Sequence, residues 1–164
     1  NEHKRVDEYV QMIINGNTVS LITDAGTPCI SDPGFLLIRE AIKNNIIITC
    51  LPGPTAFVPA LVMSGLPSDS FIFEGFLPRK KGRKSKLYEI SQNTKTTILY
   101  ESPFRIIKTL SDMKETIGSD RKIAIVREIS KIYEEVFRGT IEEAILEYNE
   151  RTIKGEFVIC IDKA

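Results

Sequence analysis

Two turns in the first third of the chain consist of the small and rigid residues that let a backbone approach a ligand closely. Residues 24–28 follow a short β-rich run, and Asp24 can accept hydrogen bonds from an amine or a ribose hydroxyl. Residues 52–56 precede an expected helix, where backbone N–H groups and the helix dipole favour a carboxylate or a phosphate. Two tight strand-to-helix turns without any ligand would have the same composition, so both interpretations stay open. The absence of GxGxxG and GxxxxGKS motifs argues against a Rossmann dinucleotide site or a P-loop.

Positive charge is concentrated in the second half, where six of the eight residues 79–86 are Lys or Arg. This run follows the end of an expected strand, on the side where the other turns are expected. That position favours contact with RNA phosphates, and a solvated loop is the alternative. With two arginines from later turns, the expected RNA-binding residues are Arg79, Lys80, Lys81, Arg83, Lys84, Lys86, Arg105 and Arg127.

Ionisable side chains also follow two later expected strands, at residues 100–105 and 127–131. Glu101 and Arg105 have the spacing of a helix-capping or i,i+4 pair, and the second group has the composition of a surface ion-pair cluster. Each cluster nevertheless follows a strand and none precedes one. In parallel α/β layers, ligands bind beyond the carboxyl ends of the strands, so a binding edge is the favoured interpretation.

The hydrophobic pattern predicts the elements that position these turns. Strands are expected at residues 18–23 and 46–50, each followed by a loop and a helix, which is typical of a parallel α/β layer. Asp32 is expected to be the N-cap of the first of these two helices. Further strands are expected at residues 71–77, 96–100, 122–128 and 157–161, with helices between them. A Pro- and Ser-containing stretch near residue 68 predicts two domains, residues 1–68 and 69–164.

Composition excludes several classes of protein. With 42% hydrophobic and 27% charged residues among 164, the chain is globular and not disordered. Its 22 basic and 22 acidic residues balance over the whole chain. Residues 1–70, however, hold only 4 of the basic and 7 of the acidic residues, so the second half carries a net positive charge and is where an anionic partner is expected to bind. Three scattered cysteines and one histidine predict no zinc site and reduced thiols, with Cys50 and Cys160 in the core. No apolar run is long enough to cross a bilayer.

Taken together, the motifs resemble those of the tetrapyrrole methylase family. The resemblance runs in order along essentially the whole chain, through residues 24–34, 51–54, 65–69, 73–78, 100–105, 127–131 and 154–156. The motifs from residue 73 onward are similar to the branch of this family that methylates the ribose 2′-oxygen of a cytidine in small-subunit ribosomal RNA.

This resemblance implies an α/β fold of two α/β domains with a ligand cleft between them, in a cytoplasmic homodimer that uses S-adenosylmethionine and binds neither membrane nor DNA. It implies donor-binding residues from both halves of the chain. They are Asp24, Ala25, Gly26, Thr27, Pro28, Pro52, Gly53, Pro54, Thr55, Ala56, Tyr100, Glu101 and Ile129. Members of the family also begin with a strand and a glycine-containing loop that this sequence lacks, so the first domain is expected to be N-terminally truncated.

The implied reaction is an in-line displacement in which a ribose 2′-oxygen attacks the sulfonium methyl group. A ribose hydroxyl is a weak nucleophile, so a general base or a neighbouring charge would assist it. Glu101, Glu128 and Lys131 are the catalytic candidates, and the sequence does not choose among them. Two alternatives stay open, namely a methylase of a small tetrapyrrole and a module that binds the donor or RNA without catalysis.

Overall fold

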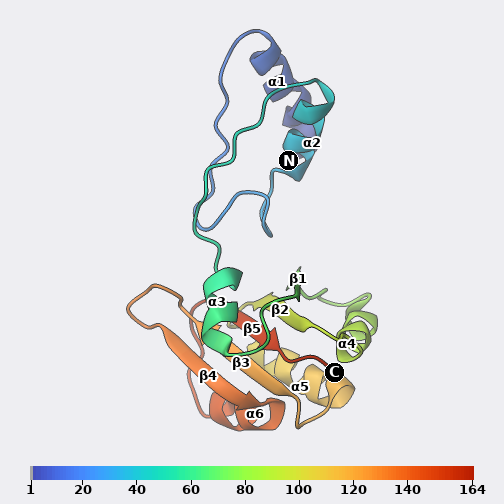
Figure 1. Cartoon of the computed structure of the whole chain (residues 1–164), viewed down its shortest axis with the longest axis vertical. Helices are drawn as coiled ribbons and strands as arrows, with labels where there is room; N and C mark the ends of the chain where they lie inside the picture. The colour runs from blue at the N-terminus through green and yellow to red at the C-terminus, as the bar shows by residue number, and fades with distance from the viewer. Residues whose placement is uncertain (1) are drawn as a thin grey trace. The chain divides into compact units, whose positions relative to one another are not determined.

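The computed structural model describes residues 2–164, with the side chains of residues 5–164. These residues form two compact units, of which the first ends at Thr55 and the second begins at Ala56. The first unit contains the helices α1 (Glu2–Ile14) and α2 (Phe35–Lys43), shown in blue and cyan in Figure 1. Val6, Val10 and Leu37 form its small buried core. The apolar spacing of the sequence predicted both helices correctly.

The two strands expected in the first unit do not form. Residues 18–23 and 46–50 are extended but belong to no sheet, and Ile22 and Ile47 are 86% and 92% exposed. A strand is stable only when a neighbouring strand takes up its backbone hydrogen bonds and a packed layer covers its side chains. Within the described residues neither run has such a neighbour. Cys50, expected in the core, is accordingly exposed.

The second unit is a five-stranded mixed sheet in the order β1-β2-β5-β3-β4. Its strands are β1 (Phe71–Phe76), β2 (Thr96–Glu101), β3 (Lys122–Arg127), β4 (Glu135–Thr140) and β5 (Phe157–Ile161). β1 and β2 are parallel, whereas β5 runs antiparallel to both β2 and β3, and β4 runs antiparallel to β3. The apolar pattern of the sequence predicted four of these strands. It did not predict β4, whose residues are mostly half-buried and therefore carry a weaker apolar pattern.

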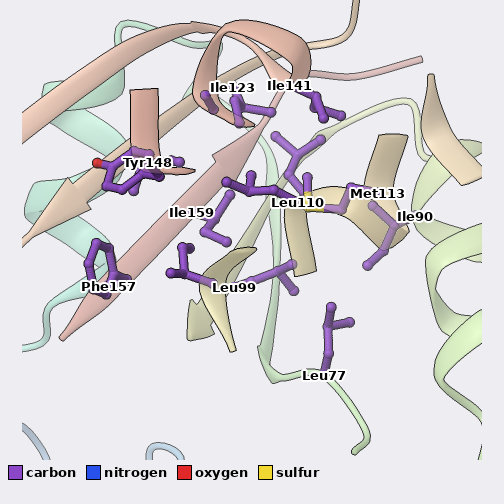
Figure 2. Close-up of a cluster of buried hydrophobic side chains, with 14 of the residues drawn as sticks. Leu77, Ile90, Leu99, Leu110, Met113, Ile123, Ile141, Tyr148, Phe157 and Ile159 are labelled. Atoms are coloured by element: carbon purple, nitrogen blue, oxygen red, sulfur yellow. The ribbon is translucent and has the colours of Figure 1, made fainter. Parts of the chain in front are cut away.

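Helices cover both faces of this sheet (Figure 1). One face packs against α4 (Arg83–Ser91), α5 (Ile106–Ile117) and α6 (Ile141–Asn149), and the other packs against α3 (Phe57–Ser64). Neighbouring strand positions alternate between the two cores: Leu99 and Ile159 face the three helices, whereas Ile98 and Cys160 face α3. Figure 2 shows the larger core, in which Leu99, Ile159 and Leu110 converge.

The boundary between the compact units differs from the expected one near residue 68. Ala60 and Leu61 of α3 are buried against the sheet of the second unit, so α3 belongs to that unit. The turn at residues 66–70, which the composition marked as a linker, therefore lies within it. No helix in the described range is both long and apolar enough to cross a membrane.

Candidate functional site

In the first unit, the two ligand-type turns lie against each other through Thr27. Its hydroxyl group donates a hydrogen bond to the Pro54 carbonyl oxygen at 2.9 Å and lies 2.8 Å from the Thr55 hydroxyl oxygen. The first turn is also fixed at its base, where the Thr23 hydroxyl donates to Asp32 at 2.5 Å. Asp32 is therefore occupied by the turn and is not the N-cap of α2, a position that Gly34 holds without a side-chain cap. The sequence missed both contacts because they join distant residues.

The glycines of these turns differ in what they require. Gly26 has a φ of +76°, in the left-handed region, so a side chain there would strain the backbone even though the space is open. Gly53 has no positive φ, and a Cβ atom there would have no protein atom closer than 3.9 Å. Local structure therefore does not explain the glycine at residue 53, whereas close approach of a ligand would.

In the second unit, the clusters predicted to follow strands lie along one edge of the sheet. Because β5 is antiparallel to both β2 and β3, the strands β1, β2 and β3 all end at the same edge, which we call the carboxyl edge. The turns that leave it begin at Leu77, Ser102 and Glu128. The sequence-based expectation that these clusters share an edge is confirmed within this unit.

Glu101 ends β2 at this edge and is buried, with its side chain only 1% exposed. One carboxylate oxygen accepts the backbone N–H of Ser102 at 2.9 Å and lies 3.4 Å from Arg105 Nε. The other oxygen accepts the Thr109 hydroxyl at 2.6 Å. A carboxylate engaged on both oxygens and shielded from solvent is arranged to hold its surroundings in place, not to take a proton from a substrate.

A buried polar network extends from Glu101 to the basic segment. The Arg83 guanidinium donates to Thr109 Oγ1 at 2.8 Å and to Asp112 at 2.7 Å. Arg83 and Arg105 also donate to the carbonyl oxygens of Pro78 and Leu77, at 3.3 and 2.9 Å. The network thus fixes the backbone from which the basic segment starts.

The sequence pattern did not indicate Thr109 or Asp112 as members of this network. They lie on α5, eight and eleven residues beyond Glu101, and no local spacing rule connects them to the turns. Burial by itself raises the pKa of Asp112, but the hydrogen bonds from Arg83 and Lys108 outweigh it and lower that pKa overall.

A second cluster joins Glu128 and Lys131 to the turn before β5. The Lys131 ammonium lies 3.0 Å from Glu128 and 2.9 Å from Glu156, and the Glu156 backbone N–H donates to Glu128 at 2.9 Å. That backbone hydrogen bond, followed by the one from Lys131, lowers the pKa of Glu128. Hydrogen bonds to Glu156 and Glu128 raise the pKa of Lys131. Glu128 is thereby a weaker base than an isolated carboxylate, and Lys131 stays protonated at neutral pH.

Gly155 allows this second cluster to form. A Cβ atom at this position would lie 2.6 Å from Glu128 Cγ, and its φ of +95° suits glycine. The sequence marked residues 154–156 as part of the family resemblance but could not connect them with Glu128, 28 residues earlier along the chain.

Tyr100 and Ile129, the other donor-binding residues expected in this unit, pack toward α3. The Tyr100 hydroxyl accepts the backbone N–H of Phe57, the first residue of α3, at 3.3 Å. Burial raises the pKa of Tyr100, so its hydroxyl stays protonated near neutral pH. Ile129 is half-buried against the core beneath α3. Tyr100 therefore stabilises the N-terminal end of this helix, which follows the second ligand-type turn along the chain.

The basic residues separate into exposed and engaged groups. Arg83 is buried at 6% exposure and bound within the network, contrary to its expected place among the RNA contacts. Lys86 pairs with Glu74 and Glu89 at 3.2 and 2.8 Å, and Arg127 donates to the Lys154 carbonyl oxygen at 2.6 Å. Those that remain exposed are Arg79, Lys80, Lys81 and Lys84.

A shallow cavity of about 470 Å³ lies at the opposite edge of this sheet, near the start of β3 and the end of β4, and no candidate residue lines it. Among the described residues, no three His, Cys, Asp or Glu side chains are grouped as a metal site would require.

Residues 2–145 match the profile of the family described as Tetrapyrrole (Corrin/Porphyrin) Methylases. The chain is also similar to several proteins named ribosomal RNA small subunit methyltransferase I. The relative from Halalkalibacterium halodurans is 48% identical over 92% of this chain and 52% of its own length. The relative from Mycobacterium bovis is 47% identical over 98% and 56%, and the one from Thermotoga maritima is 39% identical over 98% and 72%. The chain thus spans about half the length of the first two relatives.

Solved structures share the fold at low sequence identity. The methyltransferase CobJ has a TM-score of 0.73 at 18% identity, covering 100% of this chain and 72% of its own. A uroporphyrin-III C-methyltransferase from Thermus thermophilus, complexed with S-adenosyl homocysteine, has a TM-score of 0.62 at 15% identity, covering 98% and 73%. The α/β fold predicted from the sequence is confirmed.

Proposed function

The chain belongs to the tetrapyrrole methylase family, and from that premise we propose that it is part of an S-adenosylmethionine-dependent methyltransferase. The proposed substrate is the ribose 2′-oxygen of a cytidine in small-subunit ribosomal RNA. One observation carries this proposal: 39–48% identity, over nearly the whole chain, to relatives named for ribosomal RNA methylation. We also propose a cytoplasmic homodimer.

The residues of the first unit fit a methyl donor. When bound, S-adenosylmethionine supplies a methyl group activated by a positively charged sulfur. The open backbone at Gly26 and Gly53 and the exposed carboxylate of Asp24 would hold its amino acid or ribose groups. Thr27 would keep the two turns together around it, through its contacts to Pro54 and Thr55. Ala25, Pro28 and Pro52 of the same two turns keep the donor-binding role that the sequence suggested.

At the carboxyl edge, the role that we propose for the former catalytic candidates is positioning. Glu101 holds the turns after β1 and β2, and Glu128 holds the turn before β5. Lys131, which stays protonated, would place a positive charge beside the attacking oxygen or a neighbouring phosphate. The exposed cations Arg79, Lys80 and Lys81 would bind the RNA backbone and so restrict the position of the substrate ribose.

A labelled-methyl transfer assay tests this proposal. Transfer from S-adenosylmethionine is measured to small ribosomal subunits that lack the modification, to a uroporphyrinogen-type tetrapyrrole, and to no acceptor. We expect label only in the ribosomal RNA, at a nucleotide resistant to alkaline cleavage because its 2′-oxygen is blocked. Label in the tetrapyrrole would support a methylase of a small tetrapyrrole. Donor or RNA binding without transfer would support a binding module without catalysis.

Gly53→Ala tests the donor site separately. Because the added methyl group meets no protein atom closer than 3.9 Å, we expect the melting temperature to stay unchanged. If the donor approaches the backbone here, calorimetry will show about tenfold weaker S-adenosylmethionine binding, equivalent to about 1.4 kcal/mol. Unchanged affinity would remove residue 53 from the site.

A further inference from the structure

Phe104 is a large aromatic side chain that the fold leaves in solvent. It lies in the turn between β2 and α5 at the carboxyl edge and is 95% exposed. Its neighbours in sequence are Pro103 and Arg105. Exposed apolar residues are common, but an aromatic ring at the tip of a well-held turn is a favourable position for stacking.

The turn that carries Phe104 is held rigidly. The Arg105 backbone N–H donates to the Ser102 carbonyl oxygen at 3.0 Å, and the Thr109 N–H donates to the Arg105 carbonyl oxygen at 2.8 Å. The carboxylate of Glu101 is buried beneath it and bound to Ser102 and Thr109. The backbone that carries the exposed ring is therefore held in place, so less backbone entropy is lost on binding.

The same turn is tied to the basic segment. The Arg105 side chain donates to the Leu77 carbonyl oxygen at 2.9 Å. This hydrogen bond joins the residue after Phe104 to the residue before Pro78. Pro78 is followed at once by the exposed cations Arg79, Lys80 and Lys81. An aromatic ring and a group of cations thus lie on two adjoining turns of one edge.

We infer that Phe104 is a stacking residue for an unpaired base of single-stranded RNA whose phosphates bind Arg79, Lys80 and Lys81. An exposed aromatic ring beside cations is the combination that binds single-stranded nucleic acid, since the ring stacks on a base while the cations follow the backbone. This inference rests on the proposed function and adds to it the residue that receives a base. It also explains why an apolar ring stays in solvent in a turn that is otherwise firmly bonded.

Because the chain contains no tryptophan, Phe104→Trp introduces a single fluorescent reporter at this position. Leu146→Trp on α6, where Leu146 is 63% exposed, is the matched control, since no candidate RNA-binding residue lies on that helix. Each variant is titrated with a single-stranded RNA oligonucleotide of mixed sequence and, separately, with inorganic polyphosphate, which has no bases. We expect RNA alone to quench the tryptophan at residue 104, and neither polyanion to quench the one at residue 146.

Affinity provides the second measurement. Phe104→Ala should weaken binding of the labelled oligonucleotide roughly 5- to 150-fold relative to the parent, the range that stacking of one base spans. Leu146→Ala should leave the affinity unchanged. Circular dichroism of both variants should match the parent, because both side chains are exposed.

Three outcomes would overturn the inference. If the parent binds RNA but Phe104→Ala binds equally well and Phe104→Trp is not quenched, the ring does not stack and the proposed function stands. If the emission of Phe104→Trp without RNA is that of a buried indole, or shifts with protein concentration, the ring is covered by the chain itself or by a second copy. If the parent binds no RNA, both the inference and the proposed function fail.

Discussion

Both carboxylates that the sequence singled out as catalytic candidates are engaged in hydrogen bonds at the carboxyl edge. Glu101 is buried and accepts hydrogen bonds on both oxygens, and Glu128 is bound by Lys131 and the Glu156 backbone. A residue type and its place after a strand are compatible with either catalysis or positioning. The number of partners distinguishes these roles, and here it favours positioning.

Thr109→Val tests the network around Glu101. The change keeps the shape of the side chain but removes one donor to Glu101 and one acceptor from Arg83, both buried. We expect the free energy of unfolding to fall by about 1–3 kcal/mol. We also expect trypsin to cleave faster after residues 79–81, because their turn is less firmly held.

Thr96→Val is the matched control for this change. Thr96 is as fully buried as Thr109, but its hydroxyl donates to the Pro67 carbonyl oxygen at the other end of β2. It should lower stability without changing cleavage after residues 79–81. Equal cleavage rates in the two variants would show that the network does not hold the basic segment.

Gly155→Ala tests the cluster around Glu128. The Cβ atom would displace the Glu128 side chain and break its bonds to Lys131 and the Glu156 N–H. In the parent, those bonds lower the folded-state pKa of Glu128 below its ordinary 4.5, so they contribute stability above that pH. The contribution is lost as the pH falls through the folded-state pKa. The variant should lose this acid-side dependence.

Urea unfolding between pH 3 and pH 7 measures this difference. Gly118→Ala is the control, because Gly118 also has a positive φ, +113°, but no atom lies within 4 Å of the added Cβ. Both variants incur backbone strain on the order of 1–3 kcal/mol. If they show the same pH dependence as each other and as the parent, Gly155 does not act through Glu128.

At the scale of elements, the start of α4 determines which cations are available. Residues 79–86 looked like one charged loop, but the helix begins at Arg83, which points that side chain into the network with Asp112 and Thr109. Lys86, one turn later, pairs with Glu74. The cations free to meet RNA are therefore concentrated before the helix and in its first turn.

Replacing Arg79, Lys80 and Lys81 together with Gln should weaken RNA binding and lower the salt dependence. Each lost phosphate contact on a single strand removes about 0.7 from the slope of log K against log salt, so three contacts remove roughly 2. Filter binding at four salt concentrations measures this slope. Donor binding should not change.

The matched control for this triple change replaces Lys95, Lys122 and Lys163, three exposed lysines at the opposite edge of the same sheet. It has the same effect on net charge. If it lowers the slope as much as the first change does, then net charge, and not the carboxyl edge, accounts for the binding.

At the scale of the whole molecule, the two units have very different cores. Within the described residues, the first buries only the apolar side chains of Val6, Val10, Leu37 and Ala41, whereas the sheet of the second is covered on both faces. Because stability rises with the apolar surface buried, the first unit should open far more readily than the second. Hydrogen exchange should accordingly be faster in α1 and α2 than in β2 and β5.

The cysteines test the protection of the core in the second unit. Burial in the second unit raises the pKa of Cys160 to about 12, so its thiolate is scarce at pH 8, whereas Cys50 is exposed. With iodoacetamide at pH 8, we expect Cys50 to be alkylated within minutes and Cys160 only under denaturing conditions, as located by mass spectrometry. Equal rates at both positions would show that Cys160 is not protected by the core of the second unit.

Local pattern in the sequence determined the helices and four of the five strands of the second unit. It also predicted that the polar clusters follow strands, because apolar runs and turns are each formed by consecutive residues of the chain. The family followed from ordered motifs. The site residues themselves remain predictions.

Only the tertiary structure decided which runs become strands and which charges are free. Residues 18–23 and 46–50 have the composition of strands, but a strand exists only where another strand pairs with it. Likewise, Arg83 and Arg79 look alike in a basic run. Arg83 is buried by contacts with Thr109 and Asp112, 26 and 29 positions away, whereas Arg79 is exposed to solvent. Pairing and burial depend on residues distant in sequence, and no local pattern encodes them.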